Sequence, residues 1–110
     1  LQGEGYHKGG AAYFIRIGGC DVGCHWCDVK ESWNPKLHPA TAIDQIISNA
    51  KDHSDTVVVT GGEPLMWDMH PLTAVLKEKS MNIHIETSCA YSVSGICICV
   101  LCVMFALQYL

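Results

Sequence analysis

Apolar and polar positions along the chain predict strands and helices in alternation. Residues 12–17 form a short run rich in aromatic and β-branched residues, which favours a strand. The continuous β-branched run 56–60 is typical of a parallel strand buried on both faces, and residues 83–87 predict a third strand. The three strands are separated by segments with helical periodicity.

Two amphipathic helices are expected between these strands. Thr41 is expected to cap a helix that runs to about Lys51, and a second helix is expected from about His70 to Lys79. Each carries one apolar stripe at helical spacing: Ile43, Ile46, Ile47 and Ala50 in the first, and Leu72, Val75 and Leu76 in the second.

This alternation predicts an α/β protein with parallel strands, in an open sheet or part of a barrel. Ligands of both architectures gather at the carboxyl ends of the strands. Each unusual segment follows a strand: the cysteine-rich loop 20–27, Gly61-Gly62-Glu63-Pro64, and Glu86-Thr87-Ser88. We therefore expect one shared site at this edge of the sheet.

Two side chains in the predicted strands are out of place in an apolar environment. Arg16 shares a face with Ala12 and Phe14, so its charge must reach a partner or the end of the strand. A solvated guanidinium at the rim and an anion-binding role are both open. His84 is interpreted as a hydrogen-bonded sheet residue rather than a ligand.

Length and charge exclude some classes of function. The 110 residues suffice for one domain, and the net charge of −4 with a pI near 5.8 gives no electrostatic footprint for nucleic acid. The chain starts without methionine and is interpreted as a fragment. Seven cysteines without a signal peptide favour a metal site in a reducing, cytoplasmic compartment.

The last part of the chain changes character. No charged residue follows Glu86, and residues 96–107 are almost entirely apolar. This stretch is shorter than the ~20 residues that a membrane helix needs, so no membrane span is expected. Residues 89–110 are interpreted as an aberrant apolar tail with a frame-altered or truncated origin.

The strongest chemical signal is Cys20, Cys24 and Cys27, three thiols within a polar, turn-prone loop. Thiolates bind soft and borderline metals. A buried cluster of reduced cysteines remains open, and so does a structural zinc site with His7, His25 or a tail cysteine as the fourth ligand.

The C-x3-C-x2-C spacing, with Trp26 just before the last cysteine, resembles the signature of the radical S-adenosylmethionine enzymes. The resemblance implies that three thiolates hold a 4Fe–4S cluster whose fourth iron binds the methionyl part of S-adenosylmethionine. It also implies that an electron from the cluster cleaves the sulfonium to give a 5′-deoxyadenosyl radical. The hard chemistry in such enzymes belongs to the cofactor.

Further segments resemble one family within this group, the 7-carboxy-7-deazaguanine synthases. They are Gln2-Gly3-Glu4-Gly5, Arg16, Thr60-Gly61-Gly62-Glu63-Pro64 and Ile85-Glu86-Thr87-Ser88. The resemblance covers residues 1 to about 96. It implies a partial (β/α) barrel truncated after about three strands, with residues 1–88 as its N-terminal half.

The implied reaction converts 6-carboxy-5,6,7,8-tetrahydropterin to 7-carboxy-7-deazaguanine with loss of ammonia, a step toward queuosine. The implied cofactors are the 4Fe–4S cluster, S-adenosylmethionine and Mg²⁺. The family is homodimeric, and an electron donor such as flavodoxin or ferredoxin is implied. No nucleic acid or membrane partner is expected.

The resemblance also implies roles for individual residues. The cluster ligands are Cys20, Cys24 and Cys27. The residues expected to border S-adenosylmethionine are Trp26, Cys27, Asp28, Gly62, Glu86, Thr87 and Ser88. Those expected to contact the pterin are Leu1, Gln2, Gly3, Arg16 and Thr60, with Arg16 on the carboxylate.

The chain departs from the family pattern at two positions. Val29 stands where the family carries a threonine that binds Mg²⁺, and an isopropyl group cannot bind a hard cation. Cys89 stands where the family has glycine. Because later strands are also absent, we expect the chain alone to be inactive or poorly folded. Another radical S-adenosylmethionine enzyme, such as a glycyl-radical activase, and a zinc-binding module remain alternatives.

Overall fold

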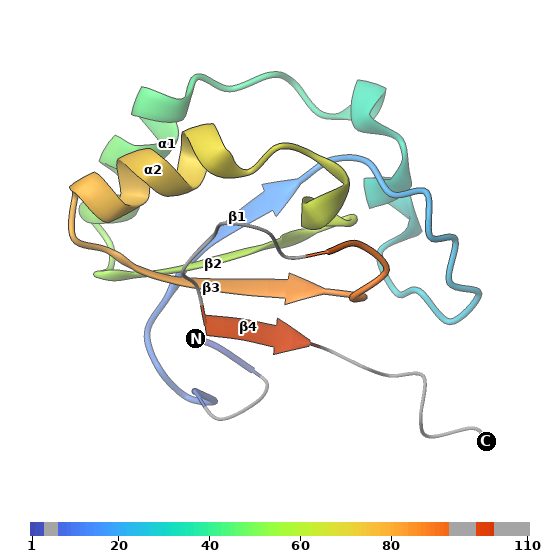
Figure 1. Ribbon diagram of the computed structural model, residues 1–110, viewed down its shortest axis with the longest axis horizontal. Coiled ribbons are helices and arrows are strands. Elements are labelled where there is room, and N and C mark those ends of the chain that lie inside the picture. Colours follow the sequence, from blue (N-terminus) through green and yellow to red (C-terminus); the bar gives the residue numbers. More distant parts are fainter. Residues whose placement is uncertain (4–6, 93–98, 103–110) are drawn as a thin grey trace.

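The computed structural model describes residues 1–3, 7–92 and 99–102, and its centre is a four-stranded parallel sheet. The strands are β1 (Tyr13–Ile17), β2 (Thr56–Gly61), β3 (Asn82–Thr87) and β4 (Cys99–Cys102), and they lie side by side in chain order. All four arrows point the same way in Figure 1, and the loop after β1 lies beyond the arrowheads. The parallel α/β architecture predicted from the sequence is confirmed.

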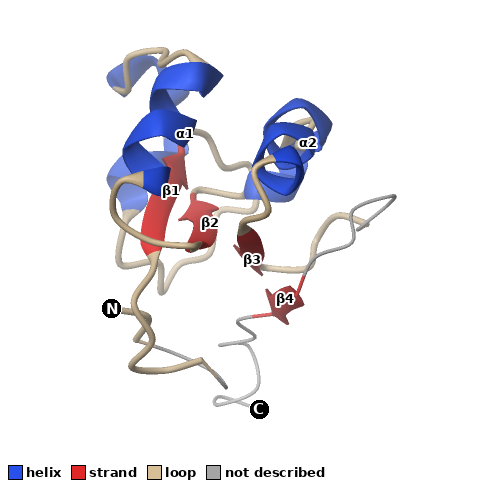
Figure 2. Cartoon of the chain, turned by 90° about the vertical axis from the view of Figure 1, so that its left-hand side faces the viewer, coloured by secondary structure: helices blue, strands red, loops and turns tan. Residues whose placement is uncertain are grey.

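Two helices cover one face of this sheet. Helix α1 (Ile43–Lys51) connects β1 to β2, and α2 (His70–Glu78) connects β2 to β3. Figure 2 shows both helices on the same side of the strands. Short 3-10 turns lie at Lys30–Trp33, Pro35–Leu37 and Pro64–Met66.

The hydrophobic core lies between the helices and this face. The alternation of β1 sends Tyr13, Ile15 and Ile17 toward the core. The rest of the core comes from the inward positions of the other elements: Ile47, Ala50, Val57, Val59, Met69, Leu72, Leu76, Met81, Ile83 and Ile85. Burial of such apolar side chains contributes about 1.5–3 kcal/mol each, so this layer stabilises the sheet.

The opposite face of the sheet carries the alternate residues of each strand. Phe14 pairs with Val58 and Val58 with His84, so these three form one row across the sheet. The N-terminal segment lies on this side, away from the helices (Figure 2). No helix in the described part of the chain covers this face, and the N-terminal segment covers part of it, since the His7 ring lies against His84 and both Val58 and His84 are buried.

The start of α1 differs from the expectation. The helix begins at Ile43 after Ala42, and no side chain caps it. The Thr41 hydroxyl instead donates to the carbonyl of Pro39 at 3.5 Å, so the predicted Thr41 cap is wrong. Pro39 keeps the preceding residue extended, and Thr41 lies one residue too early to reach the first free N–H groups.

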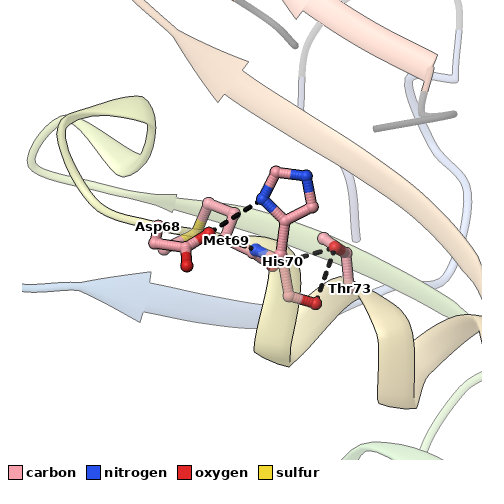
Figure 3. Close-up of polar contacts among 4 residues, drawn as sticks. All are labelled: Asp68, Met69, His70 and Thr73. Carbon is pink, nitrogen blue, oxygen red and sulfur yellow. Dashed lines mark hydrogen bonds and ion pairs between the residues drawn. The ribbon is translucent and has the colours of Figure 1, made fainter. Parts of the chain in front are cut away.

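Helix α2 has a better-defined start and end. The Asp68 carboxylate accepts from the His70 backbone N–H at 3.0 Å and contacts the His70 ring at 2.8 Å (Figure 3). At the other end, Ser80 adopts a positive φ of 58°, and Met81 N–H donates to the Leu76 carbonyl at 3.1 Å. This left-handed closure ends the helix at Glu78, one residue before the expected position.

Two further features were not foreseen. The imidazole of His84 is only 7% exposed, and its Nδ1 has no hydrogen-bond partner among the described residues, so the expectation of a hydrogen-bonded sheet residue is wrong. Its ring instead lies 4.3 Å from that of His7. Strand β4 lies within the segment assigned to the apolar tail; residues 93–98 and 103–110 of that segment are outside the described residues.

None of the helices that the structure describes is long and apolar enough to cross a bilayer.

Candidate functional site

A row of polar side chains crosses the face of the sheet opposite the helices, near the carboxyl ends of the strands. Arg16 of β1 pairs in register with Thr60 of β2. The Thr60 hydroxyl donates to Oε2 of Glu86 in β3 at 2.9 Å. Parallel strands in register place such partners on the same face, so Arg16, Thr60 and Glu86 lie next to one another.

Gln2 joins this row from the other end of the sequence. Its side-chain amide donates to Oε1 of Glu86 at 2.9 Å, so both carboxylate oxygens of Glu86 accept a hydrogen bond. The backbone of Gln2 bonds to Gly9 and Gly10, which closes the N-terminal segment into a loop. Gln2 is only 3% exposed, whereas Leu1 and Gly3 beside it are exposed.

Arg16 stands apart from this network. Its side chain is exposed and has no ion pair with any described residue. A guanidinium that lies beside Thr60 and is not engaged by a carboxylate of the described chain is suited to bind a ligand carboxylate in a bidentate manner.

The loop with the three cysteines follows β1 directly. Its first residues are bound on both sides: Gly19 N–H donates to the Ser32 carbonyl at 2.7 Å, and Glu63 N–H donates to the Gly19 carbonyl at 2.9 Å. A Cβ on Gly62 would collide with that same Gly19 carbonyl. Gly62 therefore allows the segment after β2 to lie against the base of the loop.

Cys20, Cys24 and Cys27 are all free thiols and partly buried. The turn between the last two is closed by a bond from Cys27 N–H to the Cys24 carbonyl at 3.1 Å. Trp26 is 50% exposed, with its ring edge-on to His25 at 4.5 Å, and Asp28 is exposed.

The donor chemistry of the loop can be tested against the group that the sequence implies. Within the described ranges, no three His, Cys, Asp or Glu side chains gather around one point as a single metal ion requires. The three thiols on a partly exposed loop are nevertheless the donor set of an iron–sulfur cluster, whose ligands bind separate irons. The residue types present therefore fit the donor set of a cluster.

Glu63 connects the segment after β2 to the end of β3. Its carboxylate is 1% exposed and accepts from Thr87 Oγ1 at 2.6 Å and from Ser88 N–H at 2.9 Å. It also accepts from the Ser88 hydroxyl and from Leu65 N–H, the latter at 3.1 Å. A buried carboxylate with this many donors is satisfied and holds the two strand ends together.

The magnesium expectation finds no support in the residues present. Val29 offers only an apolar side chain, and its carbonyl accepts from Ser32 N–H at 2.9 Å and from the Ser32 hydroxyl at 2.7 Å. The exposed Asp28 is the adjacent hard donor in the sequence.

Comparison with known proteins agrees with this arrangement. The model of the radical SAM superfamily matches residues 14–95, which include all three cysteines and the ends of β1, β2 and β3. The chain belongs to the radical SAM superfamily.

Three relatives of this radical SAM chain have the same name. The chain is 67% identical over 95 residues to the 7-carboxy-7-deazaguanine synthase of Flavobacterium psychrophilum, covering 86% of this chain and 45% of that protein. It is 49% identical to the synthase of Synechocystis, covering 86% and 46%. It is 35% identical to the synthase of Escherichia coli K12, covering 84% and 51%.

A solved structure is also similar to this chain. The crystal structure of QueE from Escherichia coli is similar with a TM-score of 0.72 and 34% identity, covering 84% of this chain and 50% of that one. The chain thus spans about half the length of the curated relatives it matches, which agrees with the partial barrel predicted from the sequence.

Several contacts at the site could not be predicted, because no pattern in the sequence indicates them. The sequence places Glu63 in a motif but does not show that it bonds to Thr87 and Ser88. The Tyr91 hydroxyl donates to the Asp21 carboxylate, a contact between residues 70 positions apart. Only the occurrence of an acid after two glycines and before proline pointed to Glu63.

Proposed function

We propose that this chain forms the cluster-binding and substrate-binding part of a 7-carboxy-7-deazaguanine synthase. The proposal depends on one observation: Gln2, Thr60 and Glu86 form a hydrogen-bonded network with Arg16 beside it, on the face of the sheet opposite the helices. The relatives and the cysteine loop support the same function. The whole reaction would convert 6-carboxy-5,6,7,8-tetrahydropterin to 7-carboxy-7-deazaguanine and ammonia.

The substrate side of the site follows from charge and hydrogen bonding. The exposed Arg16 guanidinium would bind the pterin carboxylate, and Thr60 beside it would contact the ring. Glu86 holds the Gln2 amide and the Thr60 hydroxyl in position, so their remaining hydrogen-bonding capacity faces the same space. Leu1 and Gly3 flank Gln2 and would add backbone contacts to the pterin.

The cofactor side lies at the carboxyl ends of the strands. Cys20, Cys24 and Cys27 would hold a 4Fe–4S cluster, and that group would supply the electron for the cleavage of S-adenosylmethionine. Trp26 and Asp28 would border that cofactor, and the open backbone at Gly62 would accept its methionyl amine. Thr87 and Ser88, both bonded to Glu63, would line its nucleoside part.

The remaining properties of the proposed enzyme are those of the family. They are a homodimer, an electron donor such as flavodoxin or ferredoxin, and a cytoplasmic location. The proposed site holds no magnesium at Val29, because an isopropyl group offers no ligand for a hard cation.

The first test is anaerobic reconstitution of the 110-residue chain with iron and sulfide. A brown protein with about four irons per chain is expected from a 4Fe–4S cluster. The Cys24→Ala variant should lose it, whereas the variant of the exposed His53, His53→Ala, should keep it. A colourless protein with stoichiometric zinc would instead establish a zinc module.

The second test measures binding of the pterin to the reconstituted chain by calorimetry. Arg16→Gln should weaken binding by roughly 10- to 100-fold, because a charge-assisted pair is lost. Lys51→Gln, on the helix-covered side, is the matched control and should leave affinity unchanged. A cluster-loaded protein that does not bind the pterin would point to a different radical SAM enzyme.

A further inference from the structure

The cysteine loop is firmly bound at its two ends but has few contacts in its middle. Gly19 and Cys20 are bonded to Ser32 and Trp33 through the backbone at 2.7 and 3.2 Å. At its far end, Ser32 is bonded to Val29. Between these anchors, the Cys27–Cys24 turn and the His25–Trp26 ring contact are internal to the loop.

One hydrogen bond connects the middle of the loop to the segment after β3. The Tyr91 hydroxyl donates to Oδ2 of Asp21, the residue that follows the first cysteine. Among the hydrogen bonds of the described chain, no other joins residues 21–28 to a distant element. The orientation of the loop over the strand ends thus depends on this pair.

The pair also completes a closed circuit of contacts around the site. Gly19 is bonded to Glu63, Glu63 is bonded to Ser88, and Tyr91 follows Ser88 by three residues and returns to Asp21. The hydrogen bond to Asp21, with smaller effects of desolvation and of the charges on Asp21, Glu63 and Cys20, raises the pKa of the Tyr91 phenol. The phenol is therefore a donor that lies near the first cysteine.

We propose that Tyr91 is a positioning residue for the cluster: by holding Asp21, it fixes the loop of Cys20, Cys24 and Cys27 against the carboxyl end of β3. This inference rests on the proposed function, because it assigns Tyr91 a task at the same site. Tyr91 acts through Asp21 and touches neither cluster nor substrate. Its effect is to set the distance and orientation of the cluster relative to Glu86, Thr87 and Ser88.

The first readout needs no cluster. Hydrogen exchange of the backbone amides 21–28 is measured in the metal-free chain for wild type, Tyr91→Phe, Asp21→Ala and the double variant. Loss of one charge-assisted hydrogen bond should speed exchange by roughly fivefold in each variant, with no further increase in the double variant. Tyr13→Phe is the matched control, because the hydroxyl of Tyr13 makes no hydrogen bond with any described residue.

The second readout uses the reconstituted chain. Tyr91→Phe should still take up iron and sulfide but release iron to a chelator roughly fivefold faster than wild type. When S-adenosylmethionine is added, the electron paramagnetic resonance signal of the reduced cluster should change less in Tyr91→Phe than in wild type, or should show a mixture of changed and unchanged species. A merely structural residue such as Tyr13 should alter neither the release rate nor this spectral response.

The outcomes separate the two proposals. A wild-type chain that takes up no cluster overturns the proposed function and this inference with it, whatever the exchange data show. A wild-type chain that takes up the cluster, with Tyr91→Phe equal to Tyr13→Phe in both readouts, overturns the role of Tyr91 alone. Faster exchange, faster iron release and an altered spectral response in Tyr91→Phe together support it.

Discussion

The hydroxyl of Thr87, the last residue of β3, donates a 2.6 Å hydrogen bond to the buried carboxylate of Glu63, which lies after β2. This contact joins the segment after β2 to the end of β3, and Ser88 adds two more donors to the same carboxylate. The position of the strand ends, and so of the proposed cofactor site, depends on an acid with almost no exposed surface.

Replacement of Glu63 should lower the free energy of unfolding. Glu63→Gln keeps the shape but places an NH2 group against donors, so the free energy of unfolding should fall by about 2–3 kcal/mol. Urea unfolding followed by circular dichroism measures the change. Glu78→Gln, at the exposed end of α2, is the control and should stay within about 0.5 kcal/mol of wild type. Equal effects in the two variants would contradict the structural role of Glu63.

Backbone strain at Cys89 gives a second prediction. Cys89 has φ of 62°, a left-handed conformation that costs an L-residue roughly 1–2 kcal/mol. Cys89→Gly should therefore unfold with a free energy about 1 kcal/mol higher than Cys89→Ala. Both variants lose the sulfur, so their difference isolates the backbone term; denaturation in reducing buffer measures it. Equal stabilities would show that Cys89 is unstrained.

The individual elements could be predicted from the sequence because their patterns are local. The β-branched run 56–60 and the apolar stripe of α1 depend only on neighbouring residues, and both were predicted within one or two residues of the observed bounds. The spacing of Cys20, Cys24 and Cys27 is equally local, and the radical SAM family that it indicated is confirmed by the match over residues 14–95. The role of the three thiols as cluster ligands stays a prediction.

Contacts between distant segments could not be predicted in this way. Gln2 and Glu86 are 84 residues apart, and a glutamine in a glycine-rich loop gives no sign that it will be buried. Strand β4 lies in a charge-free stretch where apolar residues show no alternation, so no period identified it. The burial of Gln2 and the position of β4 both depend on how distant segments pack together in the complete sheet.

The pair at the start of α2 predicts a dependence of stability on acid. The hydrogen bonds from His70 lower the pKa of Asp68 below its usual 3.8 (Figure 3). A carboxyl whose pKa is lower in the folded chain stabilises the fold above pH 3.8, and this contribution is lost as the pH falls through the folded value. Asp68→Asn should remove this part of the acid dependence. The free energy of unfolding between pH 5 and about pH 2.5 is the measurement. An unchanged slope in the variant would contradict the assignment.

The buried imidazole of His84 predicts a second dependence, at higher pH and with a different cause. Desolvation, and secondly the nearby His7 ring, lower the pKa of His84 below 6.5. The unfolded chain therefore binds a proton at this position before the folded chain does, so the free energy of unfolding should fall as the pH drops below about 6.5 and level off below the folded pKa. His84→Leu should flatten this decline, because leucine fills a similar volume and does not titrate. The ring protons of His84, followed by nuclear magnetic resonance, should titrate below 6.5 in the wild-type chain. A midpoint at or above that value would show that His84 gains a partner on protonation, and the face of the sheet that carries Glu86 would then be stabilised by acid rather than weakened.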